Sequence, residues 1–252
     1  MFDAAQIAAA TGIQHIEIHD EVDSTNTRGI ELCKLAFAPG LIVTEVQTSG
    51  RGRRSNTWWS DSDSLTFSII LGQEVASPEL LASSTALSII LAIEESTGLK
   101  DLKIKWPNDV IAESEKLAGI LIEKSNQKFV IGIGVNVNQK AIPETDASSF
   151  SASSVYMKSG NELDQQSLMI QIVQRLMHCQ NDSSRSAESN SRLLNAIQRR
   201  LFFLDRQVEI GFSDGTSTLG VFKGVNRQGA AVLETSKGLQ EIFSGTLRSS
   251  PS

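Results

Sequence analysis

The stretch "KLAGILIEKSNQKFVIGIGVNVN", from Lys116 to Asn138, decides much of how this chain folds. Two runs rich in aliphatic and β-branched residues, "KLAGILIEKS" and "KFVIGIGVNVN", are joined by a short polar turn, which predicts two neighbouring strands. Gly132 and Gly134 lie inside the second run, where missing side chains weaken packing unless something needs the room. A flat ligand is one group that uses such space.

Further strands and helices lie on both sides of this stretch. We expect strands at "HIEIHDEV", "GLIVTEVQ", "SLTFSIIL" and "LKIKWPNDVI", since each is rich in apolar or alternating residues. "DSTNT" supplies good N-cap residues, Asp23 to Thr25, for a helix through about Ala36. The segment from Pro78 to Gly98 is apolar over so much of its circumference that its helix should lie in the core. This alternation predicts an α/β domain.

The texture of the sequence changes towards its C-terminus. "DQQSLMIQIVQRLM" is an amphipathic helix, and the Ser-rich "QNDSSRSAESNS" that follows predicts a loop before another helix. After Leu204, short β runs alternate with Gly, Asp and Asn, as in "RQVEIGFSDG" and "STLGVFKGVNRQGAAVLET". We therefore expect a larger domain over residues 1–204 and a small β-barrel domain over residues 205–252.

The charge of the chain limits its function. Its 252 residues include 23 Lys and Arg against 29 Asp and Glu, for a formal net charge of -6, and 40% are hydrophobic. A protein whose main partner is a nucleic acid backbone usually has a basic excess. We therefore expect a globular protein with one substantial core, in which any arginine cluster serves a local purpose.

Cysteine content and hydropathy exclude other classes. Cys33 and Cys179 have no CxxC spacing, and only three histidines accompany them, so neither a disulfide framework nor a zinc site is indicated. No apolar run approaches the roughly 20 residues that span a bilayer, and "MFDAAQIAAATG" lacks the basic flank of a signal peptide. We expect a cytoplasmic protein with no membrane contact.

One loop concentrates positive charge on a flexible backbone. "QTSGRGRRSNTWWS", from Gln47 to Ser60, separates two predicted strands. It holds three arginines and two glycines: Arg51, Arg53, Arg54, Gly50 and Gly52. Glycine lets a backbone approach a ligand closely, and guanidinium groups suit phosphate or carboxylate oxygens. A phosphate-wrapping loop and a solvated basic turn fit this pattern equally well, and Trp58 and Trp59 favour packing over ligand contact.

Two further motifs place polar groups beside strands. In "KWPNDV", Pro107 forces an extended or turn geometry, and Asn108-Asp109 can hold a ribose, a magnesium ion or an amine. An isolated hexapeptide of this kind is more often a plain turn, with Lys105 in solvent. In "KLAGILIE", Lys116 is either a solvated gatekeeper at the strand end or an ammonium aimed into a cleft. The residues alone favour the gatekeeper.

Taken together and in this order, "DSTNT", "QTSGRGRRSNTW", "KWPNDV", "KLAGILIE" and "GIGVNVN" resemble the biotin–protein ligases. The resemblance covers about Val22 to Asn138, and the β tail is similar to the small C-terminal domain of that family. It implies a helix-flanked mixed sheet akin to class II aminoacyl-tRNA synthetases, followed by a barrel of the Src-homology-3 type. It also implies that biotin and ATP with Mg²⁺ give biotinyl-5'-adenylate, from which biotin passes to a lysine of a biotin carboxyl carrier protein.

The resemblance also implies roles for individual residues. A carboxylate that attacks the α-phosphorus of ATP brings two anions together, so fixed cations lower the barrier. The catalytic cations would be Lys116, Arg53 and Arg51. Biotin would be held by Ser24, Thr25, Asn26, Gln47, Gly50, Arg51, Lys116, Gly119 and Gly132, the last two leaving room for the ring and valeryl chain. ATP and the adenylate would be held by Arg51, Arg53, Arg54, Trp58, Lys105, Asn108, Asp109 and Asn136. Magnesium would be bound by Asp109 and Asn136.

The chain departs from the family pattern at Ser55-Asn56, where many members carry Gly-Arg. One cation and one flexible residue are lost there. The first predicted strand starts after only about a dozen residues, which leaves no room for a winged helix-turn-helix, so we expect no DNA binding. The oligomeric state, monomer or homodimer, stays open. We expect Thr48 to Asn56 to form a lid over the adenylate, and the β tail to serve the ligase without holding biotin.

Two alternative functions remain. A lipoate–protein ligase or octanoyltransferase would share the fold and an acyl transfer to lysine. From a different class, a non-catalytic module could use the arginines to bind nucleic acid, in which case its affinity should fall steeply with salt.

Overall fold

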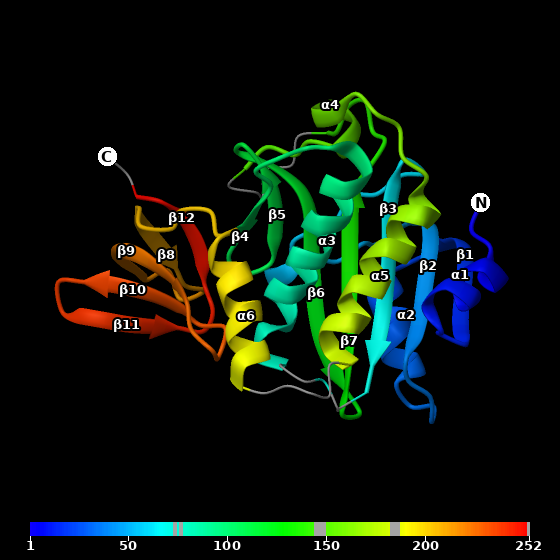
Figure 1. The fold of residues 1–252 in the computed structure, drawn as a ribbon, viewed down its shortest axis with the longest axis horizontal. Coiled ribbons are helices and arrows are strands. Elements are labelled where there is room, and N and C mark those ends of the chain that lie inside the picture. Colours follow the sequence, from blue (N-terminus) through cyan, green and yellow to red (C-terminus); the bar gives the residue numbers. More distant parts are fainter. Residues whose placement is uncertain (73–74, 76–77, 144–149, 182–186, 251–252) are drawn as a thin grey trace.

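A seven-stranded mixed sheet forms the centre of the protein (Figure 1). The computed structural model describes all of the chain except residues 73–74, 76–77, 144–149, 182–186 and 251–252. The strand order is β1-β2-β3-β7-β6-β5-β4, and only the β1–β2 pair is parallel among the neighbours. The strands are β1 (His15–Val22), β2 (Gly40–Gln47), β3 (Ser64–Leu71), β4 (Lys103–Lys105), β5 (Asp109–Ala112), β6 (Glu115–Ser125) and β7 (Lys128–Asn136).

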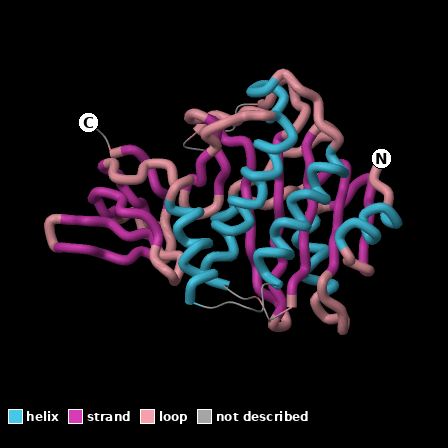
Figure 2. Tube along the Cα trace, in the orientation of Figure 1, coloured by secondary structure: helices cyan, strands magenta, loops and turns pink. Residues whose placement is uncertain are grey.

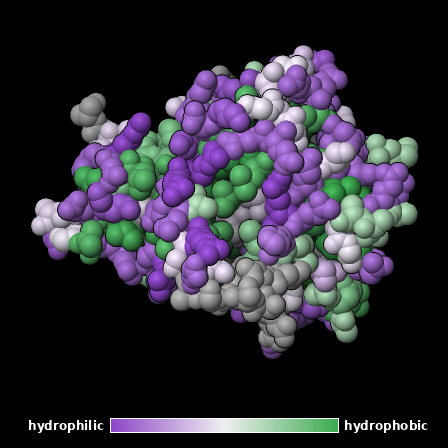
Figure 3. Space-filling model, viewed as in Figure 1, coloured by the Kyte–Doolittle hydropathy of each residue, from purple (hydrophilic) through white to green (hydrophobic). Residues whose placement is uncertain are grey.

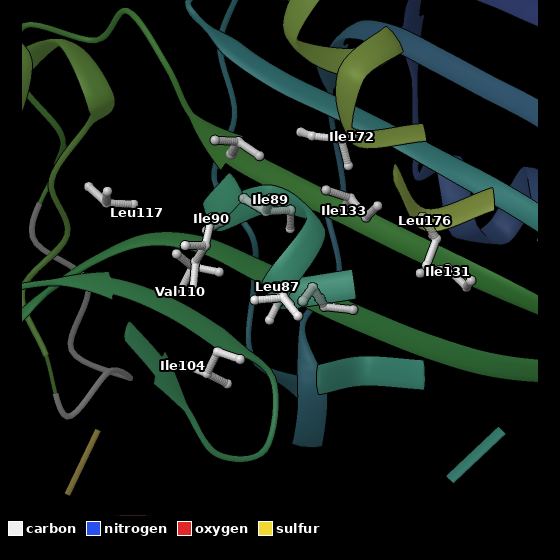
Figure 4. Close-up of a cluster of buried hydrophobic side chains, with 14 of the residues drawn as sticks. Leu87, Ile89, Ile90, Ile104, Val110, Leu117, Ile131, Ile133, Ile172 and Leu176 are labelled. Carbon is white, nitrogen blue, oxygen red and sulfur yellow. The ribbon is translucent and has the colours of Figure 1, made fainter. Parts of the chain in front are cut away.

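Helices α3 (Leu81–Thr97) and α5 (Gln165–Asn181) cover one face of this sheet (Figures 1 and 2). Alternate apolar residues of β3 and β7 point to that face, and Figure 4 shows Ile131 and Ile133 of β7 packed among side chains of both helices. Helix α3 ends at Gly98, which adopts a left-handed backbone (φ 76) and donates its N–H to Glu94 O. Both the helix and its glycine stop were predicted from the sequence.

The apolar character of α3 follows from this position. By length and composition, Pro78–Thr97 is the one helical segment in the described part of the chain that could cross a membrane, and 67% of its apolar window is buried inside the protein. That segment includes the short 3₁₀ turn η2 (Pro78–Leu80). Its apolar residues are therefore accounted for by the core.

Helix α2 (Thr25–Leu32) lies on the opposite face of the sheet. Its C-terminal end packs with Leu32 and Cys33 against Ile42, Ile70 and Val130, which form a second, smaller apolar cluster. Beyond the N-terminus of α2, the residues of β3 on this face become polar: Ser64, Thr66 and Ser68. The two faces of β3 thus differ because the sequence alternates, and the polar half of this face is where a cavity lies.

A second, antiparallel sheet follows at the C-terminus, as expected. Its order is β11-β10-β9-β8-β12. The strands are β8 (Gln207–Gly211), β9 (Ser217–Val225), β10 (Ala231–Thr235), β11 (Gly238–Ile242) and β12 (Thr246–Ser249). Buried residues of both sheets belong to one continuous hydrophobic cluster, and Trp106 Nε1 donates to Gly229 O across the junction (3.1 Å). Helix α6 (Ala187–Gln198) lies between the sheets (Figure 1).

Hydrophobic side chains also reach the surface of the second sheet. Leu219, Leu239 and Phe243 are between 53% and 70% exposed. Figure 3 shows hydrophobic areas over this part of the molecule.

Four local expectations need correction. "LKIKWPNDVI" is a hairpin of two short strands, β4 and β5, because Pro107 cannot donate to a ladder. Helix α2 ends at Leu32 and not near Ala36, since the chain must turn back to begin β2 at Gly40. Part of the predicted Ser-rich loop is helical: α5 runs to Asn181 and α6 starts at Ala187. A helix needs only one apolar face, so a polar run does not exclude it. Two further short helices, α1 (Ala4–Thr11) and α4 (Val155–Ser159), were not predicted.

Candidate functional site

A cavity of about 360 Å³ opens on the face of the main sheet that carries α2. Its walls come from the N-terminus of α2, the arginine loop between β2 and β3, the β4–β5 hairpin, strands β6 and β7, and β12 of the second sheet. Most residues that the sequence assigns to biotin or ATP line it: Ser24, Thr25, Asn26, Gln47, Arg51, Arg53, Arg54, Trp58, Lys105, Asn108, Asp109, Lys116, Gly119, Gly132 and Asn136. Segments far apart in the sequence therefore meet at one place.

Gly50 is the one assigned residue outside this lining. Its carbonyl oxygen accepts a hydrogen bond from the Trp58 N–H (2.9 Å), and a Cβ in its place would lie 2.2 Å from Trp58 O. Glycine is required here because the two arms of the loop approach each other closely. Its role in the structure is to shape the loop.

Glycines form part of the floor of the cavity. The register of β3, β7 and β6 places them in two neighbouring rows. One row across the three strands is Ser68, Gly132 and Leu121, and the next is Thr66, Gly134 and Gly119. A Cβ on Gly132 would lie 2.3 Å from Asn26 Oδ1, and one on Gly134 would lie 2.3 Å from the Trp58 ring. The glycines thus make room for Asn26 and Trp58 of the protein itself, and not only for a ligand as the sequence suggested.

Uncharged polar groups close the end of the cavity nearest α2. Gln47 Oε1 accepts hydrogen bonds from the backbone N–H (2.9 Å) and the hydroxyl (3.2 Å) of Thr25. Ser68 Oγ lies 2.7 Å from both Thr25 Oγ1 and Asn26 Oδ1. Ser24, at the N-cap of α2, is also buried. This end suits a small neutral group with its own donors and acceptor, because buried polar groups require partners.

The arginine loop is folded against three walls of the cavity. Within the loop, Gly52 N donates to Asn56 O (2.7 Å). Each arginine contacts a different element: Arg51 pairs with Glu123 of β6 (2.5 Å), Arg53 donates to Asn108 of the hairpin (3.3 Å) and Arg54 donates to Thr246 of β12 (2.5 Å). Arg54 lies in the 3₁₀ turn η1 (Arg53–Ser55) with a left-handed backbone (φ 55). Asn56, one of the two residues that differ from the family pattern, closes the turn through its backbone carbonyl oxygen, which accepts the hydrogen bond from Gly52. The side chain of Ser55, the other one, lies outside the described part of the structure.

The cavity is electropositive although the protein is acidic. Six cations are among its described lining residues: Arg51, Arg53, Arg54, Lys105, Lys116 and Arg248. Asp109 is the one carboxylate in that described lining, and its Oδ1 lies 2.8 Å from Lys116 Nζ. Cations held in a partly enclosed site attract an anion far more strongly than they do in water. The arrangement therefore favours a ligand with several negative charges.

Lys105 is the most buried of these cations, at 6% exposed, and Arg53 is half-buried. Burial lowers the pKa of Lys105 to about 8; Asp109 opposes this shift, and the positive charges of Lys116 and Arg248 add to it. Lys105 Nζ also lies 4.5 Å from the centre of the Phe150 ring. Burial likewise lowers the pKa of Arg53 from its usual value. An anion in the cavity would favour the charged forms of both groups.

Asn108 in the β4–β5 hairpin and Asn136 at the end of β7 each hold a neighbouring stretch of backbone in place. Asn108 Nδ2 donates to Ile120 O (2.7 Å), and Asn136 Nδ2 donates to Ser153 O (3.0 Å). In the described part of the chain, no group of three or more His, Cys, Asp or Glu side chains gathers to bind a metal. Magnesium often takes only one or two carboxylates and completes its shell with phosphates and water, which Asp109 can satisfy.

Several lining residues were not predicted from the sequence. Thr66 Oγ1 is buried and has no hydrogen-bond partner within the described structure, so it is available to a ligand. The same holds for Nε1 of Trp58, a residue that the sequence had assigned to the nucleotide. The alternation of Ser64, Thr66 and Ser68 was a signal for a polar strand face. Arg248 and Thr246 gave no such signal; both lie on β12 of the second sheet, which forms part of the cavity wall.

Comparison with known proteins gives consistent results. The family model described as Biotin/lipoate A/B protein ligase family matches residues 20–139. The Bifunctional ligase/repressor BirA of Bacillus subtilis is 28% identical over 249 residues, covering 93% of this chain and 74% of the relative. Biotin--[acetyl-CoA-carboxylase] ligase of Paracoccus denitrificans is 28% identical over 233 residues, covering 87% of this chain and 94% of the relative. The structure of the biotin protein ligase from Aquifex aeolicus in complex with biotin and ATP superposes with a TM-score of 0.82 at 30% identity, covering 94% of this chain and all of the other.

Proposed function

The chain belongs to the biotin protein ligases, and from this premise we propose that it forms biotinyl-5'-adenylate and transfers biotin to a lysine of a biotin carboxyl carrier protein. It is an ATP-dependent ligase that uses biotin and ATP. The intermediate, the acceptor and the roles of single residues are the parts that we propose.

One observation carries the proposal: the order of chemical environments along the cavity. The neutral network of Thr25, Gln47 and Asn26 lies over the first row of the floor, and the Trp58 ring lies over the second. The Nζ of Lys116 lies 3.1 Å from the position of a Cβ on Gly119, in that second row. Biotin has the same order of groups, with an uncharged ureido head, an apolar ring and chain, and a carboxylate.

The first half-reaction needs cations at the reacting centre. A carboxylate oxygen of biotin attacks the α-phosphorus of ATP, the bond to the β-phosphate oxygen breaks, and pyrophosphate leaves. Negative charge accumulates on the α-phosphate oxygens, where fixed donors stabilise it. We assign Lys116 to the position between carboxylate and α-phosphate, with Arg51 and Arg53 of the loop on the phosphate side. Asp109 holds the Lys116 ammonium in place through their ion pair.

The second half-reaction transfers the acyl group. The neutral ε-amine of the acceptor lysine attacks the carbonyl carbon of the mixed anhydride, the bond to the phosphate oxygen breaks, AMP leaves, and the nitrogen loses a proton. Lys116 and the arginines also stabilise the phosphate of the departing AMP, because it is the same α-phosphate whose negative charge they stabilised in the first half-reaction. Water would destroy the anhydride, so a loop that covers it protects the intermediate.

Magnesium fits this site only together with the nucleotide. The phosphates of ATP would supply most ligands and Asp109 one oxygen, and the ion would neutralise phosphate charge. Asn136 donates its amide nitrogen to backbone carbonyl oxygens of Ser153 and Lys116, which leaves its Oδ1 as the atom that would bind the ion.

The test is isotope exchange between ATP and pyrophosphate. We expect exchange to depend on biotin, with lipoate and octanoate giving little, and calorimetry to show biotin binding without ATP. Exchange supported by lipoate and not by biotin would assign the chain to the other branch of its family. A neutral pocket should keep its biotin affinity as salt increases, whereas nucleic acid binding would weaken steeply.

A further inference from the structure

Glu123 of β6 joins the arginine loop to the floor of the cavity. Its Oε2 accepts a hydrogen bond from Arg51 Nη2 (2.5 Å) and another from Asn26 Nδ2 (2.9 Å). The Glu123 side chain is 26% exposed and that of Arg51 41% exposed, while Asn26 is only 3% exposed. One carboxylate oxygen therefore connects Arg51, a partly exposed residue of the arginine loop, to Asn26, a buried residue over the floor.

The amide of Asn26 depends on Glu123 for its orientation. Its Nδ2 donates to Leu121 O (3.2 Å) as well as to Glu123, and its Oδ1 lies 2.7 Å from Ser68 Oγ. Through Ser68 this amide connects to Thr25, which in turn donates to Gln47. A carboxylate that accepts both from Asn26 and from Arg51 can thus transmit the position of the loop to the groups assigned to the ureido head.

The carboxylate is held ready for Arg51. An ion pair between two partly exposed side chains contributes little by itself, because the side chains must be ordered and water screens them. Here Asn26 has already fixed the acceptor oxygen, so less ordering remains when Arg51 binds. Arg51 closes the loop onto β6, while Arg53 and Arg54 contact the hairpin and β12.

On the basis of the proposed function, we propose that Glu123 is a positioning residue that couples closure of the loop 48–56 to the biotin-binding floor. It touches no reacting atom in this scheme; it acts through Arg51 and Asn26. Coupling between two sites is reciprocal, so biotin on the floor should stabilise the closed loop, and a closed loop should strengthen biotin binding by the same factor.

The experiment measures loop closure and biotin binding in Glu123→Gln. Trypsin cleavage after Arg53 and Arg54, followed by mass spectrometry, reports loop opening. We expect cleavage of the empty variant to be at least about fivefold faster than that of the wild type, and protection by biotin to shrink by a similar factor. The KM for biotin in pyrophosphate exchange should increase more than kcat decreases, which a general loss of structure would not produce.

Glu115→Gln is the matched control. Glu115 lies on the same strand with a similar exposed fraction, 31%, and pairs with Lys158 instead of the loop. We expect wild-type cleavage and wild-type KM for this variant. In an Arg51→Ala background, Glu123→Gln should add no further cleavage at Arg53 and Arg54; additive effects would show that Glu123 does not act through Arg51. If Glu123→Gln does not fold, Arg51→Ala alone tests the same contact from the loop side and should open the loop to the same extent.

The outcomes separate this inference from the function. A wild-type protein that binds no biotin overturns the proposed function. A wild type that binds biotin, together with a Glu123→Gln variant of wild-type loop cleavage and KM, overturns only the coupling role of Glu123.

Discussion

Replacing Lys116 with alanine should remove most adenylate formation while biotin still binds. Lys116 Nζ lies 2.8 Å from Asp109 Oδ1, and its side chain is 23% exposed at the head of β6. The neutral groups assigned to the ureido head, such as Thr25 and Gln47, bond to each other and not to Lys116. The change therefore deletes a cation near the carboxylate end and leaves the other end of the site intact.

The expected loss of rate is large and the expected loss of stability is small. Removal of one well-placed electrostatic donor typically lowers the rate by about 10²–10³-fold, or about 2.7–4 kcal/mol. The variant also loses the Lys116–Asp109 ion pair, whose groups are 23% and 18% exposed. Against this, one of six mutually repelling cations is removed, and the remaining five still neutralise Asp109. We expect the free energy of unfolding to change by no more than about 1 kcal/mol.

The assay combines biotin-dependent pyrophosphate exchange, biotin calorimetry and thermal unfolding. Lys124→Ala is the control, because Lys124 lies on the same strand, is exposed and contacts the Phe129 ring outside the cavity. We expect exchange in Lys116→Ala to fall at least about a hundredfold below both the wild type and this control. Near-normal exchange would refute the reasoning and return Lys116 to a solvated strand end. An equal loss of biotin binding would show that the residue holds the floor instead of the reacting centre.

Three other variants test other walls of the cavity. Arg53→Gly removes the contact to Asn108 (3.3 Å) and should speed dissociation of the adenylate in stopped flow more than it weakens biotin binding; an unchanged off-rate would rule out the loop as a lid. Burial lowers the pKa of Lys105 to about 8, and a bound triphosphate should raise it again, so nucleotide binding should take up about half a proton at pH 8 and almost none at pH 6. The affinity for the nucleotide should then fall as pH rises through 8. Calorimetry in buffers of different ionisation heat measures the proton uptake, which should vanish in Lys105→Met. Arg248→Ala should raise the KM for ATP several-fold with little change for biotin, since it lines the cavity from β12; equal changes in both would contradict that placement.

Much of the main sheet could be predicted from sequence because its signals are local. The strands β1, β2 and β3 match the runs "HIEIHDEV", "GLIVTEVQ" and "SLTFSIIL" residue for residue. Their alternating or continuous apolar patterns record burial directly, and Gly98 marks the end of α3 because it supplies a left-handed backbone. The errors fell where a local signal was ambiguous, as at Pro107, which splits one predicted strand into a hairpin.

The motifs of the candidate site could also be found in the sequence, since each is short and contiguous. Taken singly, the arginine loop, the Asn108-Asp109 pair and Lys116 each allowed a structural or a functional interpretation. The order of these motifs along the chain, which resembles that of the biotin–protein ligases, favoured the functional one. What the motifs could not give was their partners. Gly132 and Gly134 indicated missing volume, but only the structure shows that Asn26 and Trp58 fill it.

The sequence by itself therefore determined the strands, the core helices and the set of polar motifs, because periodicity and turn chemistry act over a few residues. The tertiary structure alone decided which of these groups meet. The sheet order places β7 between β3 and β6, which brings Ser68, Gly132 and Leu121 into one row and Glu123 within reach of both Asn26 and Arg51. It also places β12, almost 200 residues from the loop, beside Arg54. Such contacts depend on strand register and on packing between distant segments, and no local pattern in a single chain encodes them.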